Sequence, residues 1–406
     1  MCHSSTSNSS SSRMEPYRFF LRGALILSPL IALAVFFELA LWRSKEIWPL
    51  SRVSREIQAA PDGTLFMRKV FDQGLYRFKY LSLKDRRPAV IALGTSRVMQ
   101  FRNEMLGAGR NDFFNAGGMI QHLRDLEEFV DTLPRDTSIR TILLGVELWW
   151  FNEKWAAEAE PQKNYLTKIG EDDALDGFAH GAVFQKLLWA SLRGRCSDAG
   201  MGMLYSAAWP ADGESLQRRW GLLALSKDMG FRKDGSYEYG SVAPSAEFVD
   251  REKPPIEERI RGQMMGYEPV TGLASNEVDR LLGCVKKLSD RGIRVIVFLP
   301  PFASGAAAAL DESPATRSIW RQYRSELPER IRASGVQIID ASTPAKLGLD
   351  DRCMYDGLHG METLYLTLLK QIAEDPSARA ALGVDPQRIA RILVDKKTNP
   401  WYPRYQ

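Results

Sequence analysis

Short apolar runs alternate with amphipathic stretches along most of the chain beyond residue 88. The apolar runs predict strands at Ala89–Leu93, Asp112–Asn115, Thr141–Val146, Arg294–Leu299 and Val336–Ile339. Helical spacing of apolar positions predicts helices at Met119–Leu133, Asn276–Arg291, Ser318–Ala333 and Glu362–Glu374. Strands that are apolar on both faces are typical of parallel sheets covered by helices. The pattern therefore predicts an α/β fold with a doubly wound, mostly parallel sheet.

A longer apolar stretch lies near the amino terminus. Residues 23–42 contain Glu38 as their only charge. At about 1.5 Å per residue, a helix of this length matches the roughly 30 Å hydrocarbon core of a bilayer. A cleaved signal peptide is the alternative, but no small-x-small cleavage site follows the run. Basic residues flank it on both sides, so charge does not fix the orientation. We expect an uncleaved, single-pass anchor.

The pattern also divides the chain into segments. We expect a disordered tail (1–22), the anchor (23–42), a connector (43–88), an α/β domain in two parts (89–150 and 276–385), an insertion between them (151–275) and a carboxyl-terminal tail (386–406). The insertion is rich in aromatic residues, namely Trp155, Trp189, Trp209, Trp220, Tyr237, Tyr239 and Tyr267. These rings form either the insertion's own core, which is the simpler interpretation, or a platform for sugar rings. The stretch Arg232–Tyr239 predicts a hairpin or loop that borders a cleft.

Charge and cysteine content argue against several classes of function. The formal net charge of the 406 residues is +4, and no cluster of lysine and arginine with interleaved aromatics indicates nucleic-acid binding. The four cysteines are scattered, and their spacing matches neither a disulfide framework nor a zinc site. We therefore expect no metal and no organic cofactor.

Two short motifs carry candidate chemistry. Ser96 ends the sequence Gly-Thr-Ser directly after the first predicted strand, where open α/β sheets bind ligands, although such a serine also fits a helix N-cap. Asp356 precedes His359 by three residues, just before the last predicted helix of the α/β domain. The other histidines, His3, His122 and His180, follow no predicted strand end. His359 is therefore the candidate general base for Ser96, with Asp356 as the acid that orients its imidazole.

Together these motifs resemble the SGNH (GDSL-like) hydrolase superfamily, especially its membrane-anchored branch that includes D-alanylation and alginate-acetylation proteins. The second block of that family resembles residues 113–118, which implies Gly118 as an oxyanion donor and Asn115 as a neighbouring cleft residue. The third block normally supplies an asparagine donor, but this chain has Glu147 there. A glutamate donates a hydrogen bond only when protonated. Asn152 or backbone amides are the candidate substitutes.

Glu147 and Arg97 have more than one interpretation. Glu147 is a solvated loop acid, the ion-pair partner of Arg97, or a cleft residue that faces the nucleophile. Arg97, next to Ser96, binds either an anionic substrate group or an acid of the protein, and we favour the acid. Both residues are therefore cleft candidates.

The resemblance implies a flavodoxin-like SGNH fold and a function in the cell envelope. The expected activity is acyl-ester transfer or hydrolysis, in particular O-acetylation, on an exported polysaccharide or cell-surface glycan. The expected location is the inner membrane, with the main domain in the periplasm. The expected partners are the bilayer, a glycan substrate and a membrane-bound acyl-donor protein, but no nucleic acid. The alternative is a catalytically degenerate SGNH-like binding or assembly subunit of a polysaccharide biosynthesis or export complex.

Overall fold

The computed structural model describes residues 15–68, 75–106, 112–158, 213–240 and 255–395. Its centre is a sheet of five parallel strands in the spatial order β3-β2-β4-β8-β9. The strands are β2 (Val90–Gly94), β3 (Phe113–Gly117), β4 (Thr141–Gly145), β8 (Arg294–Leu299) and β9 (Gln337–Asp340). When these five strands are numbered from 1 to 5 along the chain, their spatial order is 2-1-3-4-5, the flavodoxin-like arrangement. The predicted α/β fold with a parallel sheet is therefore confirmed.

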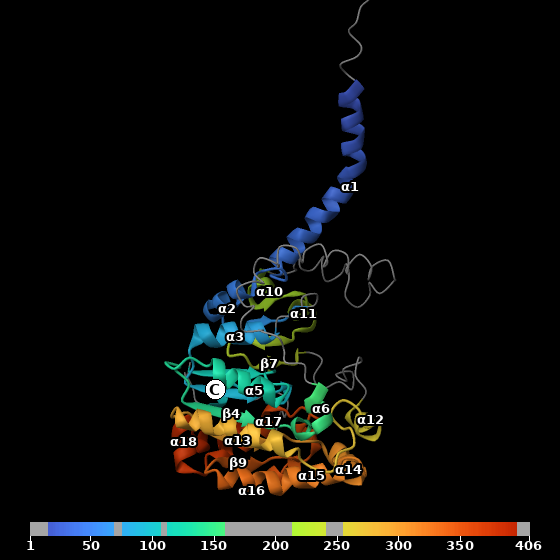
Figure 1. Cartoon of the computed structure of the whole chain (residues 1–406). Helices are drawn as coiled ribbons and strands as arrows, with labels where there is room; N and C mark the ends of the chain where they lie inside the picture. The colour runs from blue at the N-terminus through green and yellow to red at the C-terminus, as the bar shows by residue number, and fades with distance from the viewer. Residues whose placement is uncertain (1–14, 69–74, 107–111, 159–212, 241–254, 396–406) are drawn as a thin grey trace, which may run out of the picture.

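Helices cover both faces of this sheet, as expected from strands that are apolar on both faces (Figure 1). One face packs against α5 (Leu123–Thr132), α13 (Ser275–Asp290), α14 (Ser304–Glu312), α15 (Arg317–Arg324) and α16 (Glu326–Ala333). The other packs against α4 (Asn103–Leu106), α17 (Glu362–Ile372), α18 (Pro376–Leu382) and α19 (Pro386–Asp395).

One predicted helix is broken in two. The stretch Ser318–Ala333 was expected to be continuous, but α15 ends at Arg324 and α16 begins at Glu326. Pro328 lies four residues after Arg324, where its ring would clash with the Arg324 carbonyl of a continuous helix and its nitrogen could not donate. The break is thus a local effect of one proline.

A second, smaller sheet joins the connector to the insertion. It contains β5 (Arg219–Trp220), β1 (Leu65–Phe66), β6 (Gly230–Arg232) and β7 (Tyr237–Glu238), in that spatial order and with mixed directions. Helices α2 (Leu50–Ala59), α3 (Leu75–Arg86), α10 (Gly213–Arg218) and α11 (Leu222–Lys227) belong to the same region, which lies between α1 and the parallel sheet in Figure 1. The connector and this part of the insertion therefore form one structural layer.

Most of the insertion's described aromatic rings are buried. Trp220, Tyr237 and Tyr239 share an apolar cluster with residues of the connector, and Tyr267 is buried in the main core. Trp155 is half-buried, and Trp189 and Trp209 lie outside the described residues. The three clustered rings therefore do form a small core, but the insertion shares this core with the connector.

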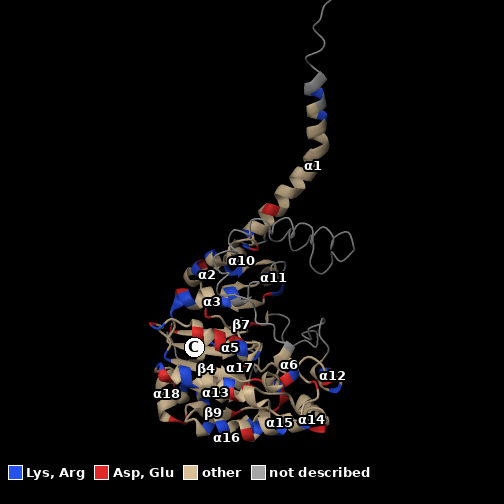
Figure 2. Ribbon diagram, viewed as in Figure 1, with Lys and Arg blue, Asp and Glu red and all other residues tan. Residues whose placement is uncertain are grey.

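The first helix, α1 (Glu15–Arg43), projects away from the folded body (Figure 1). Residues Phe20–Arg43 are long and apolar enough to cross a membrane, and most of their surface is exposed. Figure 2 shows hardly any charge along this part of the helix. The helix could be a membrane anchor or a signal sequence.

Candidate active site

Ser96 lies just beyond the carboxyl end of β2, the strand between β3 and β4. It begins a short 3-10 turn (Ser96–Val98) that folds back over the strand ends. A notch of three glycines allows this turn, because Val98 packs against Gly94, Gly117 and Gly145 on three adjacent strands. A Cβ atom on Gly145 would lie 2.5 Å from a methyl carbon of Val98, and one on Gly117 would lie 2.8 Å from the other. The turn therefore depends on glycine at these strand ends.

The loop that carries Asp356 and His359 comes from the other end of the chain. It begins after a short 3-10 turn (Asp351–Cys353) and leads into α17. The Tyr355 amide donates to the His359 carbonyl at 2.7 Å and closes the loop. Oδ1 of Asp356 accepts the backbone amides of Leu358 and His359, each at 2.7 Å. The acid thus shapes the loop in addition to facing the histidine.

The three predicted triad residues meet in hydrogen-bonding geometry. The Oγ atom of Ser96 lies 2.9 Å from Nε2 of His359, and Nδ1 of His359 lies 2.8 Å from Oδ2 of Asp356. A proton on Nδ1 would donate to the carboxylate and leave Nε2 as the acceptor that faces the serine. The side chains of His359 and Asp356 are 21% and 26% exposed, so solvent and ligands can reach them.

The electrostatics keep Asp356 ionised. Burial by itself would raise the pKa of this carboxyl group. The neighbouring imidazole of His359, its hydrogen bond and the two backbone amides outweigh that effect and hold the pKa of Asp356 well below its usual range. The carboxylate is therefore charged and able to stabilise an imidazolium.

Arg97 and Glu147 form a buried ion pair behind the triad. Their side chains are 1% and 0% exposed, and Nη1 of Arg97 lies 2.5 Å from Oε2 of Glu147. The Thr95 hydroxyl donates to the other carboxylate oxygen at 2.5 Å. Burial raises the pKa of Glu147, while the Arg97 charge and this hydrogen bond oppose the rise. Of the three interpretations of Glu147, the ion-pair partner is the one observed.

Arg97 also connects the turn that begins at Ser96 (Ser96–Val98, the candidate nucleophile turn) to the loop that carries Asp356 and His359 (the histidine loop). Its Nε donates to the carbonyl of Leu358, the residue before His359, at 3.1 Å. Its Nη2 donates to the Pro301 carbonyl after β8, and its own carbonyl accepts from the Tyr365 hydroxyl on α17. One side chain thus holds three strand ends and the histidine loop together. Because Arg97 and Glu147 are fully buried, neither lines an open cleft.

Two implied oxyanion groups already have partners inside the protein. The Gly118 amide donates to the Gly94 carbonyl at 2.9 Å, so it is not free to bind an oxyanion in this conformation. The Asn115 side chain donates to the carbonyls of Val98 and Phe101, each at 2.8 Å. Both N–H bonds of this amide are therefore used, and Asn115 anchors the turn that follows Ser96 instead of lining the cleft.

Asn152, the other suggested substitute, is also occupied. Its side chain donates to the carbonyls of Gly266 and Glu268 and accepts the Lys154 amide at the start of α6 (Glu153–Glu158). The Ser96 amide is different, because it is the first amide of a 3-10 turn and has no acceptor within that turn. It therefore remains a candidate backbone donor to an oxyanion.

The insertion contributes a wall to the site. Its hairpin of β6 and β7 confirms the hairpin expected over Arg232–Tyr239. The amide of Tyr237 donates to the Met99 carbonyl in the nucleophile turn at 3.0 Å. The buried Tyr239 ring lies edge to face with the His359 imidazole, with ring centroids 6.4 Å apart, and 4.2 Å from the Tyr355 ring.

A buried arginine fixes the same hairpin to the helix after His359. Arg102 forms ion pairs with Glu238 of β7 and with Glu362 in the first turn of α17. No local pattern in the sequence marks Arg102, Glu362 or the Thr95 hydroxyl as site residues, since their partners are between 52 and 260 residues away.

We expect Tyr239 to position the His359 ring. Tyr239→Ala should slow acylation of Ser96 by about tenfold, the upper range for one aromatic contact, whereas Tyr239→Phe should change it less than about twofold. The rate of labelling by a fluorophosphonate probe measures this. The low-field NMR signal of the His359 Nδ1 proton should persist in Tyr239→Phe and broaden in Tyr239→Ala. Equal behaviour of the two variants would rule out the positioning role.

The remaining candidates lie elsewhere. His122 is half-buried and stacks on Trp155 with ring centroids 5.2 Å apart. His3 and His180 lie outside the described residues. Among the residues that the structure describes, no group of three or more histidine, cysteine or acidic side chains could hold a metal ion.

Comparison with known proteins gives no assignment. No protein-family profile matches the chain, and no curated protein is significantly similar to it in sequence. The function of the site is therefore inferred from its geometry.

Proposed function

We propose that this chain is a membrane-anchored serine acyltransferase or esterase of the SGNH-like kind. The observation that carries the proposal is the hydrogen-bonded chain from Ser96 through His359 to Asp356, with separations of 2.9 and 2.8 Å. Serine, histidine and aspartate in this order form an activated nucleophile, and these three lie at the edge of the sheet where α/β folds place their sites. Ser96 lies 263 residues before His359, so proximity along the chain does not explain why the serine meets the loop that carries Asp356 and His359.

The geometry suggests the following chemistry. The Ser96 Oγ attacks the acyl carbonyl while His359 Nε2 takes the hydroxyl proton, and Asp356 stabilises the imidazolium. The bond between the acyl carbon and the leaving oxygen then breaks, and His359 returns the proton to that oxygen. A sugar hydroxyl, or water, then attacks the acyl carbon of the acyl-enzyme while His359 takes its proton. The bond between the acyl carbon and the Ser96 Oγ breaks, and His359 returns the proton to Ser96. The Ser96 amide is the proposed first donor to the oxyanion.

The proposed substrates are an acyl ester as donor and an exported polysaccharide or cell-surface glycan as acceptor, with O-acetylation as the expected reaction. A membrane-bound acyl-donor protein would be the partner. The partly exposed His359 and Asp356 support access for a large acceptor. A glycan acceptor is implied by the resemblance of the motifs to the membrane-anchored branch of the SGNH superfamily.

The proposed location is the inner membrane, with the catalytic domain in the periplasm. Packing of the residues just after α1 favours an uncleaved anchor. The Gly221 amide donates to the Ser44 carbonyl at 2.6 Å, and the Leu222 amide donates to the Glu46 carboxylate at 2.7 Å. Cleavage directly after α1 would make these bonded residues, Ser44 and Glu46, the new amino terminus of the chain.

Reporter fusions test the proposed orientation. Alkaline phosphatase fused to the carboxyl terminus should be active, because this enzyme folds only in an oxidising compartment. A fluorescent protein that folds only in the cytoplasm should stay dark at the same position. Fluorescence without phosphatase activity would place the domain in the cytoplasm and contradict the proposal.

Mass spectrometry separates transfer from hydrolysis. Protein mixed with p-nitrophenyl acetate should gain one acetyl group at Ser96. Addition of an oligosaccharide acceptor should speed the loss of this adduct by about tenfold or more, because a bound acceptor hydroxyl competes well with water. Loss at the same rate without acceptor would indicate an esterase. The absence of any adduct on folded protein would contradict both activities.

The second candidate is a binding or assembly subunit of a polysaccharide export complex. One observation favours it, namely that the side chains of Asn115, Glu147 and Asn152 all bond within the protein. An oxyanion hole with fewer donors lowers turnover, since one donor typically contributes about 2.7–4 kcal/mol. The intact triad geometry favours the enzyme.

A further inference from the structure

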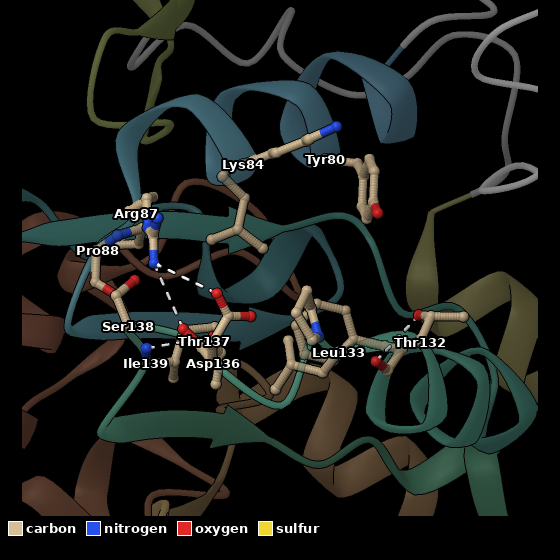
Figure 3. Close-up of a pocket in the computed structure, with 13 residues that line it drawn as sticks. Tyr80, Lys84, Arg87, Pro88, Thr132, Leu133, Asp136, Thr137, Ser138 and Ile139 are labelled. Carbon is tan, nitrogen blue, oxygen red and sulfur yellow. Dashed lines mark hydrogen bonds and ion pairs between the residues drawn. The ribbon is translucent and has the colours of Figure 1, made fainter.

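Figure 3 shows a hollow of about 410 Å³. It is lined by Pro88 and Ile139, which precede β2 and β4, whereas Ser96 follows the carboxyl end of β2. Its walls come from α3, from the end of α5 with the following loop, and from Pro88 just before β2. Strands rise about 3.3 Å per residue, so the five residues of β2 place the hollow roughly 17 Å or more from the nucleophile turn. The hollow is therefore separate from the candidate active site.

The inner surface of the hollow is apolar. Its deepest residues are Leu83, Phe129 and Ile139, which belong to the main hydrophobic core. The half-buried Tyr80 and Leu133 extend this surface toward the mouth, as Figure 3 shows. A hollow of this volume is within the range of small-molecule sites, which are about 300–1,000 Å³.

Two of the hydroxyl groups around the hollow already donate to the backbone. The Thr132 hydroxyl donates to the Glu128 carbonyl at 2.7 Å, and the Ser138 hydroxyl donates to the Pro88 carbonyl at 3.0 Å. A ligand with polar groups in its body would lose their hydration against the inner surface of Leu83, Phe129 and Ile139, whose side chains offer no hydrogen bond. The body of a ligand that fits must therefore be apolar.

The mouth carries one excess positive charge. Arg87 donates to the Asp136 carbonyl at 3.4 Å and lies 4.0 Å from the Asp136 carboxylate, so these two charges offset each other. Lys84 also lines the hollow and is exposed, and it has no ion-pair partner among the described residues. The single uncompensated cation favours a singly charged anion, because a phosphate dianion would keep one charge without a partner.

We propose that this hollow binds a small carboxylic acid with an aliphatic or aromatic body, whose carboxylate pairs with Lys84. The apolar surface takes the body of the molecule, and the ammonium group of Lys84 fixes which end faces the solvent. The proposal does not depend on the triad being catalytic, because the two sites lie at opposite ends of the sheet.

Calorimetric titration of the full chain in lipid nanodiscs tests the proposal. The probes are octanoate and octanol, and the same titration of empty nanodiscs is subtracted. Octanoate should bind about fivefold more tightly than octanol, the size of one exposed charge pair. Lys84→Met should lower octanoate affinity to the octanol level and leave octanol unchanged. Lys370→Met, at an exposed lysine in the last turn of α17, should have no effect.

A variant that fills the hollow completes the test. Leu133→Trp should remove binding of both probes while the circular dichroism spectrum stays the same. Equal affinity for octanoate and octanol, or an unchanged octanoate affinity in Lys84→Met, would overturn the proposal. So would binding of both probes to folded Leu133→Trp. The lysine comparison stands even if the tryptophan variant does not fold, because Lys84 is exposed.

Discussion

Ser96→Ala is expected to lower ester turnover by about 10³-fold or more, and His359→Ala should have an effect of similar size. The double variant should lose little beyond either single change, because residues that act as one unit are strongly non-additive. Asp356→Asn should be comparable or milder, since it leaves the imidazole in place but favours the wrong tautomer. Hydrolysis of p-nitrophenyl acetate and labelling by a fluorophosphonate probe measure these effects.

Matched controls exist for both residue types. Ser138→Ala removes a hydroxyl that bonds to the Pro88 carbonyl, and His122→Ala removes a half-buried imidazole that stacks on Trp155. Both should keep near-normal turnover. If Ser96→Ala retained wild-type turnover in folded protein, the enzyme proposal would fail and the binding subunit would remain. Additive losses in the double variant would mean that the two residues act independently.

Glu147→Gln is expected to destabilise the protein by about 3–5 kcal/mol, because it leaves the buried guanidinium of Arg97 without a counter-charge. The same reasoning applies to Glu147→Asn, which would introduce the oxyanion asparagine of the SGNH superfamily that the motifs resemble. We expect that variant to lose stability and not to gain turnover, since residue 147 is buried and bonded to Thr95 and Arg97. Urea unfolding in a mild detergent, followed by tryptophan fluorescence, gives the free energy of unfolding.

An exposed ion pair provides the control. Lys286 and Asp290 pair at 2.7 Å with side chains 74% and 61% exposed, so Asp290→Asn should change stability by less than about 1 kcal/mol. A similarly small effect of Glu147→Gln would mean that Glu147 is neutral in the folded protein. That result would contradict an ionised pair with Arg97, although the hydrogen bonds of Arg97 to the Leu358 and Pro301 carbonyls would remain.

The sequence determined the main sheet and the positions of the triad residues. Parallel strands buried on both faces need continuous apolar runs, and that requirement is visible within five or six residues. Ser96 could be placed because it follows such a run, and the Asp356–His359 spacing is local to one loop. The break before α16 could also have been predicted from the sequence, because Pro328 alone explains it.

The tertiary structure decided how the site is supported. The strands β1, β5 and β7 have two residues each, too few for an alternating pattern to indicate them. The pairing of Arg97 with Glu147 joins residues 50 apart in sequence, and the pairing of Arg102 with Glu362 joins residues 260 apart. Such contacts depend on which strand ends are neighbours in the sheet.

The oxyanion donors depended most on the tertiary structure. Gly118 and Asn115 have residue types that could donate to an oxyanion, and the motif placed both near Ser96. The fold directs the Gly118 amide to the Gly94 carbonyl and the Asn115 amide group to the turn after Ser96. The direction of an N–H bond is set by backbone dihedral angles and by the nearest acceptor, and neither can be read from residue type. The sequence thus determined which residues lie at the end of β2, and only the packing of neighbouring strands decided which of their polar groups stay free for chemistry.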